Sequence, residues 1–153
     1  MTITTHTAIG AVIGFSVGTP LLGFALGIAS HLLVDMIPHG DAFISEQFRV
    51  HKKKKTAVRY GSIDSLIAMM LALFIFNLDH TTSTMAVSAA IAGSVLPDLL
   101  VGMFDVTKSK YLKKVNGLHW FFHDFFVTRY KDVKLRHGLI LQVGIVVALV
   151  SSL

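Results

Sequence analysis

Long apolar runs alternate with short polar segments along the chain, and five of these runs have the length of a helix. They cover residues 1–18, 20–37, 60–77, 85–104 and 138–153. At 1.5 Å per residue, a run of about 17 residues forms a helix of about 25 Å, which just spans the apolar core of a bilayer. A sixth run, 118–127, is aromatic and too short to cross. The pattern predicts an all-α polytopic membrane bundle, with about five spanning helices plus one short interfacial helix.

Glycines recur every four residues on the first two of these runs. Gly10, Gly14 and Gly18 lie on the first run, and Gly23 and Gly27 lie on the second. Small residues at this spacing let helix backbones approach closely in lipid. We therefore expect the first two helices to form a tight antiparallel pair.

The composition supports a membrane protein of one domain, covering residues 1–153. Hydrophobic residues make up 53% of the chain and charged residues only 15%, whereas a soluble domain carries about 25% charged residues. There is no cysteine, which excludes disulfides and thiolate metal ligands. Any transition-metal site must therefore be built from histidine and carboxylate.

The positive charges are confined to the middle of the chain. All 14 Lys and Arg residues lie between Arg49 and Arg136, in three segments separated by apolar runs. The positive-inside rule places these loops, and with them the N-terminus, in the cytoplasm. In a membrane protein a net charge of +5 indicates a surface for anionic lipid headgroups rather than nucleic acid. The expected partners are therefore membrane lipids.

The stretch 30–41 concentrates candidate metal ligands. His31 and Asp35 are four residues apart, so they share one face of a helix. Pro38 disfavours continuation of that helix, which leaves His39 and Asp41 in the turn beyond it. The plainer alternative is a hydrogen-bonded pair at a helix end followed by an ordinary turn residue.

The expected topology brings further ionisable side chains to the same cytoplasmic end. Ionisable groups at membrane depth are costly and indicate function. Neutral imidazole and carboxylate suit zinc above all, with manganese or iron as alternatives, and one to three ions would neutralise the cluster. The candidate metal ligands are His6, His31, Asp35, His39, Asp98, His119 and His123, and the candidate catalytic carboxylates are Asp64 and Asp124.

Several of these residues also have an ordinary structural interpretation. Asp98 follows Pro97 and alternatively caps the next helix segment. His119 and His123 are flanked by aromatic residues and alternatively serve as interfacial side chains with polar tips. Asp64 and Asp124 alternatively act as capping groups or as partners that orient the metal ligands.

These motifs resemble a known family. An early Thr-His, then Ser-His-Leu-Leu-Val-Asp-Met-Ile-Pro-His at residues 30–39, Leu-Pro-Asp at 96–98 and a late aromatic segment with histidines resemble the bacterial inner-membrane metal-dependent hydrolases, described as LexA-regulated and inner-membrane-associated. More distantly, the pattern is similar to the zinc-dependent phospholipase C superfamily. The resemblance implies a bacterial inner-membrane location and metal-ligand roles for His6, His31, Asp35, Asp98 and His123.

The first functional hypothesis is a membrane-bound metal-dependent hydrolase that acts on a lipid-like phosphoester at the cytoplasmic headgroup level, through a metal-activated water. A carboxylate outside the ligand set, Asp64 or Asp124, would move the proton. The second hypothesis is a metal or ion transporter, which would require polar groups through the membrane depth. The third is a metal-stabilised membrane protein without catalysis.

Overall fold

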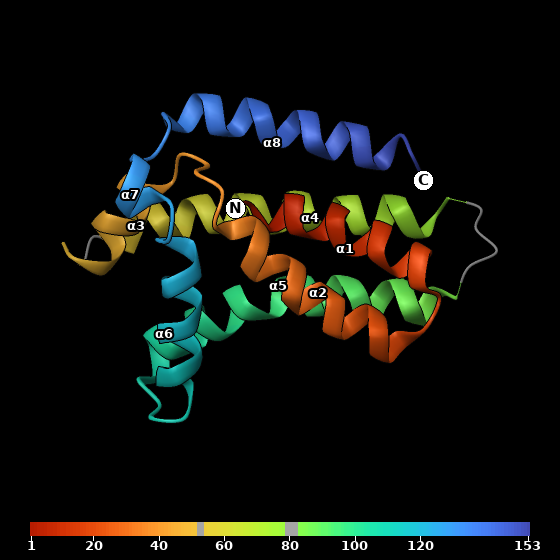
Figure 1. Cartoon of the computed structure of the whole chain (residues 1–153), viewed down its shortest axis with the longest axis horizontal. Helices are drawn as coiled ribbons and strands as arrows, with labels where there is room; N and C mark the ends of the chain where they lie inside the picture. The colour runs from red at the N-terminus through yellow and green to blue at the C-terminus, as the bar shows by residue number, and fades with distance from the viewer. Residues whose placement is uncertain (52–53, 79–82) are drawn as a thin grey trace.

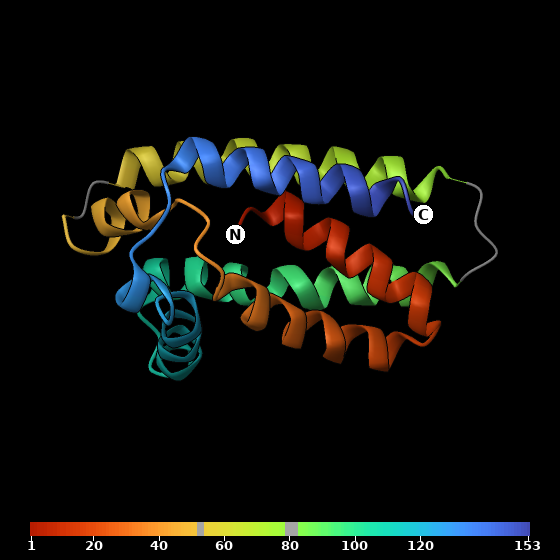
Figure 2. The ribbon, with the colours of Figure 1, turned by 45° about the horizontal axis from the view of Figure 1, so that its top comes forward.

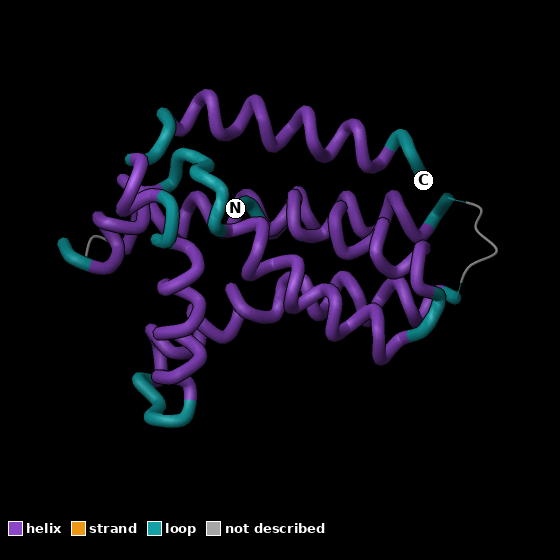
Figure 3. Tube along the Cα trace, in the orientation of Figure 1, coloured by secondary structure: helices purple, strands orange, loops and turns teal. Residues whose placement is uncertain are grey.

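The computed structural model describes residues 1–51, 54–78 and 83–153, and every regular element in these ranges is a helix. The trace in Figure 3 is accordingly helical with short connections. The sequence expectation of an all-α fold is confirmed. The elements are α1 (Ile3–Val17), α2 (Pro20–Asp35), α3 (Ala42–Arg49), α4 (Lys54–Phe76), α5 (Thr84–Thr107), α6 (Leu112–His123), α7 (Val127–Tyr130) and α8 (Leu135–Val150).

Five helices run along the long axis of the molecule, and the three others gather at one end. Figures 1 and 2 show α1, α2, α4, α5 and α8 lengthwise, with α3, α6 and α7 together at the end where α2 finishes and α8 begins. The basic segments around α3, α6 and α7 therefore share one end, as the sequence predicts. The polar residues Asp79 and His80, expected at the opposite end, lie outside the described residues.

The glycine faces of α1 and α2 are used differently from the prediction. A side chain at Gly10 or Gly14 of α1 would collide with α5, and so would one at Gly27 of α2. α1 and α2 are in contact, but the expectation that their glycines form this contact is wrong, because both helices turn these glycines towards α5. α5 supplies a matching face of small residues, among them Ala90 and Ser94. This close contact fixes the end of α2 against the middle of α5.

Two predicted boundaries are corrected. The sequence leaves residues 39–59, between the second and third apolar runs, as a polar loop, but this segment contains the eight-residue helix α3 and the first turns of α4. Its short amphipathic pattern buries Ile44 and gives a weak helical signal amid polar residues. The last helix begins at Leu135, whereas the apolar run begins at residue 138. The first turn of this helix contains polar residues, so the apolar pattern did not include it. α2 ends at Asp35, just before Pro38, as predicted.

Two helices, Lys54–Phe76 and Thr84–Thr107, are long and apolar enough to cross a membrane. α1, α2 and α8 are apolar but shorter, at 15, 16 and 16 residues. The structure thus supports two of the five expected spans by length. Large apolar side chains are nevertheless exposed along α4, including Leu66, Met70 and Phe74, so this helix presents an apolar surface to its surroundings.

Candidate metal centre

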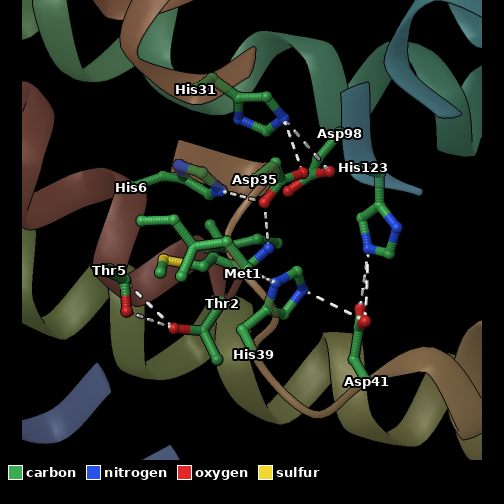
Figure 4. A network of polar contacts seen from close by, with 12 residues as sticks. Met1, Thr2, Thr5, His6, His31, Asp35, His39, Asp41, Asp98 and His123 are labelled. Atoms are coloured by element: carbon green, nitrogen blue, oxygen red, sulfur yellow. Dashed lines mark hydrogen bonds and ion pairs between the residues drawn. The ribbon is translucent and has the colours of Figure 1, made fainter. Parts of the chain in front are cut away.

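The last turn of α2 positions the first two candidate ligands. His31 and Asp35 are one turn apart and almost completely buried. Nδ1 of His31 donates to the backbone carbonyl of Ser94 on α5, with an N···O distance of 2.7 Å. This contact leaves the lone pair of His31 Nε2 free to face Asp35, which is how metal-binding histidines are usually held. Figure 4 shows both side chains directed towards the same point.

α5 and α6 complete a first ligand set, formed by His31, Asp35, Asp98 and His119. The Nε2 atom of His31 lies 3.5 Å from Asp35 Oδ2 and 3.7 Å from Asp98 Oδ1. The Nε2 atom of His119 lies 3.9 Å and 3.8 Å from the same two oxygens. These separations exceed a normal hydrogen bond. They are close to the roughly 3.3–3.6 Å that separates tetrahedral ligands about 2.0–2.2 Å from a shared ion.

The turn after α2 and the end of α6 form a second set, made of His39, Asp41 and His123. Nδ1 of His39 donates to the carbonyl of Ile37 at 2.7 Å, so its Nε2 atom faces Asp41 Oδ1 at 3.1 Å. Nε2 of His123 lies 3.2 Å from the same oxygen. Without a proton or a metal ion between them, these electron-rich atoms would repel one another. The set therefore has the donor chemistry and the spacing of a cation site.

His6 lies beside the first set. It is fully buried, stacks on the ring of His31 with centroids 4.0 Å apart, and places Nε2 3.1 Å from Asp35 Oδ1. Its Nδ1 atom and Asp35 Oδ2 have no hydrogen-bond partner among the described residues. The amino group of Met1 also contacts Asp35. Buried polar atoms without partners are costly, and a metal ion in the first set would satisfy Asp35 Oδ2, with His6 Nε2 directed at the same carboxylate.

Both ligand sets open into one cavity of about 290 Å³. α6 connects them, because His119 and His123 are one turn apart, with ring centroids separated by 5.8 Å. Four carboxylates line the cavity, namely those of Asp35, Asp41, Asp64 and Asp98, and its described lining contains no Lys or Arg. Buried carboxylates need compensating positive charge. The amino group of Met1, which contacts Asp35, and the protonated ring of His123 supply part of that charge, and divalent ions would supply the rest.

Electrostatic neighbours give the two α6 histidines different charge states. Burial lowers the pKa of His119 to about 3, which keeps this ring neutral and able to bind metal. Burial also opposes protonation of His123, but hydrogen bonds to Asp124 and Asp41 outweigh it and raise the pKa of His123 to about 9. Despite burial, the hydrogen bond from His123 holds the pKa of Asp41 well below its usual range. A metal ion at the second set would therefore have to displace the proton that His123 holds against Asp41.

The two candidate catalytic carboxylates have partners of their own. Asp64 accepts hydrogen bonds from the backbone N–H of Ile3 at 2.5 Å and from the hydroxyl of Thr4 at 2.6 Å, so it holds the start of α1. Asp124 accepts from Nδ1 of His123 at 3.0 Å and from Arg49 at 2.7 Å. These contacts agree with the alternative interpretation, in which Asp64 is a capping group and Asp124 orients a metal ligand. A catalytic role for either carboxylate stays a prediction.

The structure brings together all seven predicted metal ligands at one end of the helix bundle. His137, in the first turn of α8, also lies at this end, but its side chain is exposed and contacts Arg136 rather than either ligand set. Asp41 was noted in the sequence as a group able to bind metal, but its partner His123 is 82 residues away. Only tertiary structure can reveal that pairing.

Sequence reasoning missed the side chains that hold the ligand turn. Asp132, before α8, accepts from the backbone N–H groups of Gly40 and Ala42, each at 2.8 Å. Gln142 of α8 donates to the carbonyl of His39 at 3.4 Å. The one available signal was Gln142, a polar residue in an otherwise apolar run. Comparison of the chain with protein-family models, curated proteins and solved structures gives no match.

Proposed function

We propose that the protein is a membrane-bound metal-dependent hydrolase that acts on a lipid-like phosphoester at the cytoplasmic headgroup level. The observation that carries this proposal is the pair of histidine–carboxylate sets opening into one cavity. Zinc is the preferred metal, because each set combines imidazole and carboxylate within the spacing of a four-coordinate ion. The proposal agrees with the resemblance to the inner-membrane metal-dependent hydrolases drawn from the sequence motifs.

The chain's own residues have separable roles in this mechanism. When bound, a divalent metal supplies a water whose pKa falls to about 7, and two ions can clamp a phosphoryl group. The first set, with His6 beside it, and the second set would each hold one ion. Asp124 orients His123 through Nδ1, and Asp64, which lines the cavity outside both ligand sets, would accept a proton. The apolar residues Ile44, Phe48 and Val101 exclude water from one side of the cavity.

The membrane location rests on length, exposure and charge. α4 and α5 are long and apolar enough to span, and exposed apolar side chains such as Leu66 and Phe74 are costly in water. α1, α2 and α8 would complete the five-span bundle, with local thinning of the bilayer to match their shorter length. The basic residues gather at the end that carries the ligands, which favours a cytoplasmic site in the inner membrane.

A transporter is the second candidate, and the position of the ligands disfavours it. Transport needs polar groups along the membrane depth, whereas all seven predicted ligands lie at one end. Residues 65–76 of α4 carry no charged side chain. Metal uptake into vesicles that requires His31 would reverse this ranking.

The experiment that tests the hydrolase proposal is phosphate release from lipid phosphoesters in reconstituted vesicles. The purified protein is stripped with a chelator, refilled with zinc and offered phosphomonoester and phosphodiester lipids. We expect zinc-dependent turnover that is lost in Asp35→Ala and His39→Ala but kept in His137→Ala, which changes an exposed histidine outside both sets. Full turnover in Asp35→Ala, or no turnover by metal-loaded wild type on any of these lipids, would reject the proposal.

A further inference from the structure

An apolar groove lies beside the metal cavity, between α4 and α8 and over the start of α1. Its volume is about 390 Å³. If one water-sized group needs about 30 Å³, this is room for roughly a dozen such groups. Its apolar lining is contributed by two helices: Ile63 and Ile67 from α4, and Leu139, Val143, Val146 and Val147 from α8.

Apart from Tyr60, the polar residues that border the groove are hydrogen-bonded to other protein groups. The hydroxyls of Thr2 and Thr5 lie 2.7 Å apart, and Gln142 accepts from the backbone N–H of Thr2 at 2.7 Å. Asp64 accepts from the hydroxyl of Thr4 at 2.6 Å. These contacts leave the groove little polar capacity to offer a ligand. Its chemistry therefore suits a hydrocarbon.

The groove and the metal cavity are neighbours that share two side chains. Tyr60 and Asp64, one turn apart on α4, line both spaces. The other three carboxylates and two histidines, His119 and His123, line the metal cavity, whereas the apolar side chains of α4 and α8 line the groove. A molecule that occupied both spaces would need a polar group joined to an apolar chain.

The groove is also open along its length. Ile63 and Ile67 are 52% and 50% exposed, and Val143 and Val147 are 62% and 59% exposed. Figures 1 and 2 show α8 running alongside α4, with α1 beside them. In a bilayer this open side would face lipid chains, so a hydrocarbon could enter sideways without crossing water.

We propose that this groove holds one hydrocarbon chain of the substrate, and that the phosphoester headgroup of the same molecule occupies the metal cavity. The inference rests on the proposed hydrolase function and extends it to a substrate class. The substrates would be phosphoesters of a long-chain alcohol, or of a lipid that can place one hydrocarbon chain in the groove. Tyr60 and Asp64 mark the junction between headgroup and chain.

The test uses dodecyl phosphate with a photoreactive diazirine near its terminal carbon, added to the zinc-loaded protein in phosphatidylcholine bilayers. Adducts are mapped by mass spectrometry. We expect labelling of the groove faces of α4 and α8 that unlabelled dodecyl phosphate displaces and butyl phosphate does not. Background labelling of exposed lipid-facing residues such as Leu21 should not be displaced. Groove labelling no greater and no more displaceable than this background would overturn the inference.

Matched variants separate the groove from the catalytic centre. Val143→Trp fills the groove, whereas Leu141→Trp adds the same bulk to an exposed α8 position outside it. We expect Val143→Trp to lower kcat/KM for dodecyl phosphate by about tenfold or more, a change of about 1.4 kcal/mol. Its turnover of butyl phosphate and its metal content should match Leu141→Trp. Ile67→Trp, on the opposite wall, provides a second variant if Val143→Trp folds poorly.

The two proposals fail in different ways. If metal-loaded protein hydrolyses neither phosphate, the hydrolase proposal fails, and the displaceable labelling still decides whether the groove binds the chain. If both phosphates are hydrolysed but Val143→Trp and Ile67→Trp behave like Leu141→Trp, the groove inference fails and the hydrolase proposal stands.

Discussion

Three histidines of the candidate metal centre are oriented by the same kind of contact. His31 and His39 donate through Nδ1 to backbone carbonyls, and His123 donates through Nδ1 to the carboxylate of Asp124. In each case Nε2 is directed to the ligand sets. A carboxylate behind a histidine raises its basicity as well as fixing its ring. Asp124 is therefore expected to affect metal binding without touching the metal.

Substitution Asp124→Ala tests this role. We expect zinc affinity of the second set to fall about 10- to 100-fold, because the ring of His123 loses its anchor. Competition titration against a chromogenic chelator measures the change. Asp105→Ala is the matched control, since Asp105 pairs with Lys54 and Lys108 instead of a ligand. Equal affinity in Asp124→Ala and Asp105→Ala would show that the contact does not tune the site.

At this scale the sequence predicted the local pairs and missed the distant ones. His31 and Asp35 share a helix face because of their spacing, and the same argument applies to His119 and His123. The sharing of Asp41 by His39 and His123 depends on how α6 crosses the end of α2. No local pattern encodes that crossing, so the division of the ligands into two sets had to come from the structure.

At the scale of elements, α8 is held against the ligand turn by a glycine contact. Gly138 packs on the backbone of His39 so closely that a Cβ atom there would overlap its carbonyl oxygen. Gly40 has φ +92°, a conformation that side chains rarely adopt, and it lies against Leu135. Hydrogen bonds from Gly40 and Ala42 to Asp132 complete this contact. The position of the second ligand set thus depends on how α8 packs.

Alanine substitutions on α8 should therefore have opposite effects. Gly138→Ala is expected to destabilise the protein by about 1–3 kcal/mol, because the added methyl overpacks the His39 turn. Gly144→Ala meets no atom within 4 Å and should stabilise the helix by up to about 1 kcal/mol. Thermal unfolding of the zinc-loaded protein in detergent measures both. A midpoint for Gly138→Ala at or above that of Gly144→Ala would contradict the contact.

The sequence predicted where the helices lie along the chain better than it predicted how they pack against one another. The apolar runs located α1, α2, α4, α5 and α8 to within a few residues in most cases, and Pro38 predicted the end of α2. The glycine spacing predicted close helix contacts, but these glycines pack on α5 rather than between α1 and α2. The small-residue face of α5 around Ala90 was not recognised in the sequence. α3 was missed since eight residues give too little periodicity.

For the whole molecule, the arrangement of the helices accounts for the asymmetry of charge. The basic segments and the ligand sets lie at one end, and the turn between α1 and α2 lies at the other (Figure 2). The sequence predicted this shared end from the number of apolar runs between basic loops. Only two helices, α4 and α5, are long enough to span a bilayer by themselves. A five-span bundle also requires α1, α2 and α8, each of which is shorter than the bilayer is thick.

Single-cysteine labelling tests that interpretation, and the chain offers a clean background because it contains no cysteine. The exposed positions Lys55 and Lys113 lie at the ligand end, and Thr19 lies at the opposite end. We expect an impermeant maleimide to label Thr19→Cys in intact cells. Lys55→Cys and Lys113→Cys should react only after the membrane is opened. Reaction of Thr19→Cys and Lys113→Cys from the same side would contradict a spanning bundle.

The most direct test of the account is the metal content of the purified protein, measured by inductively coupled plasma mass spectrometry. We predict about two equivalents of zinc after refilling, about one in His31→Ala and about one in His39→Ala, because each substitution disables one ligand set. His137→Ala should retain the wild-type value. Wild-type protein that binds no transition metal after refilling, or ligand variants that bind as much as wild type, would contradict the metal centre.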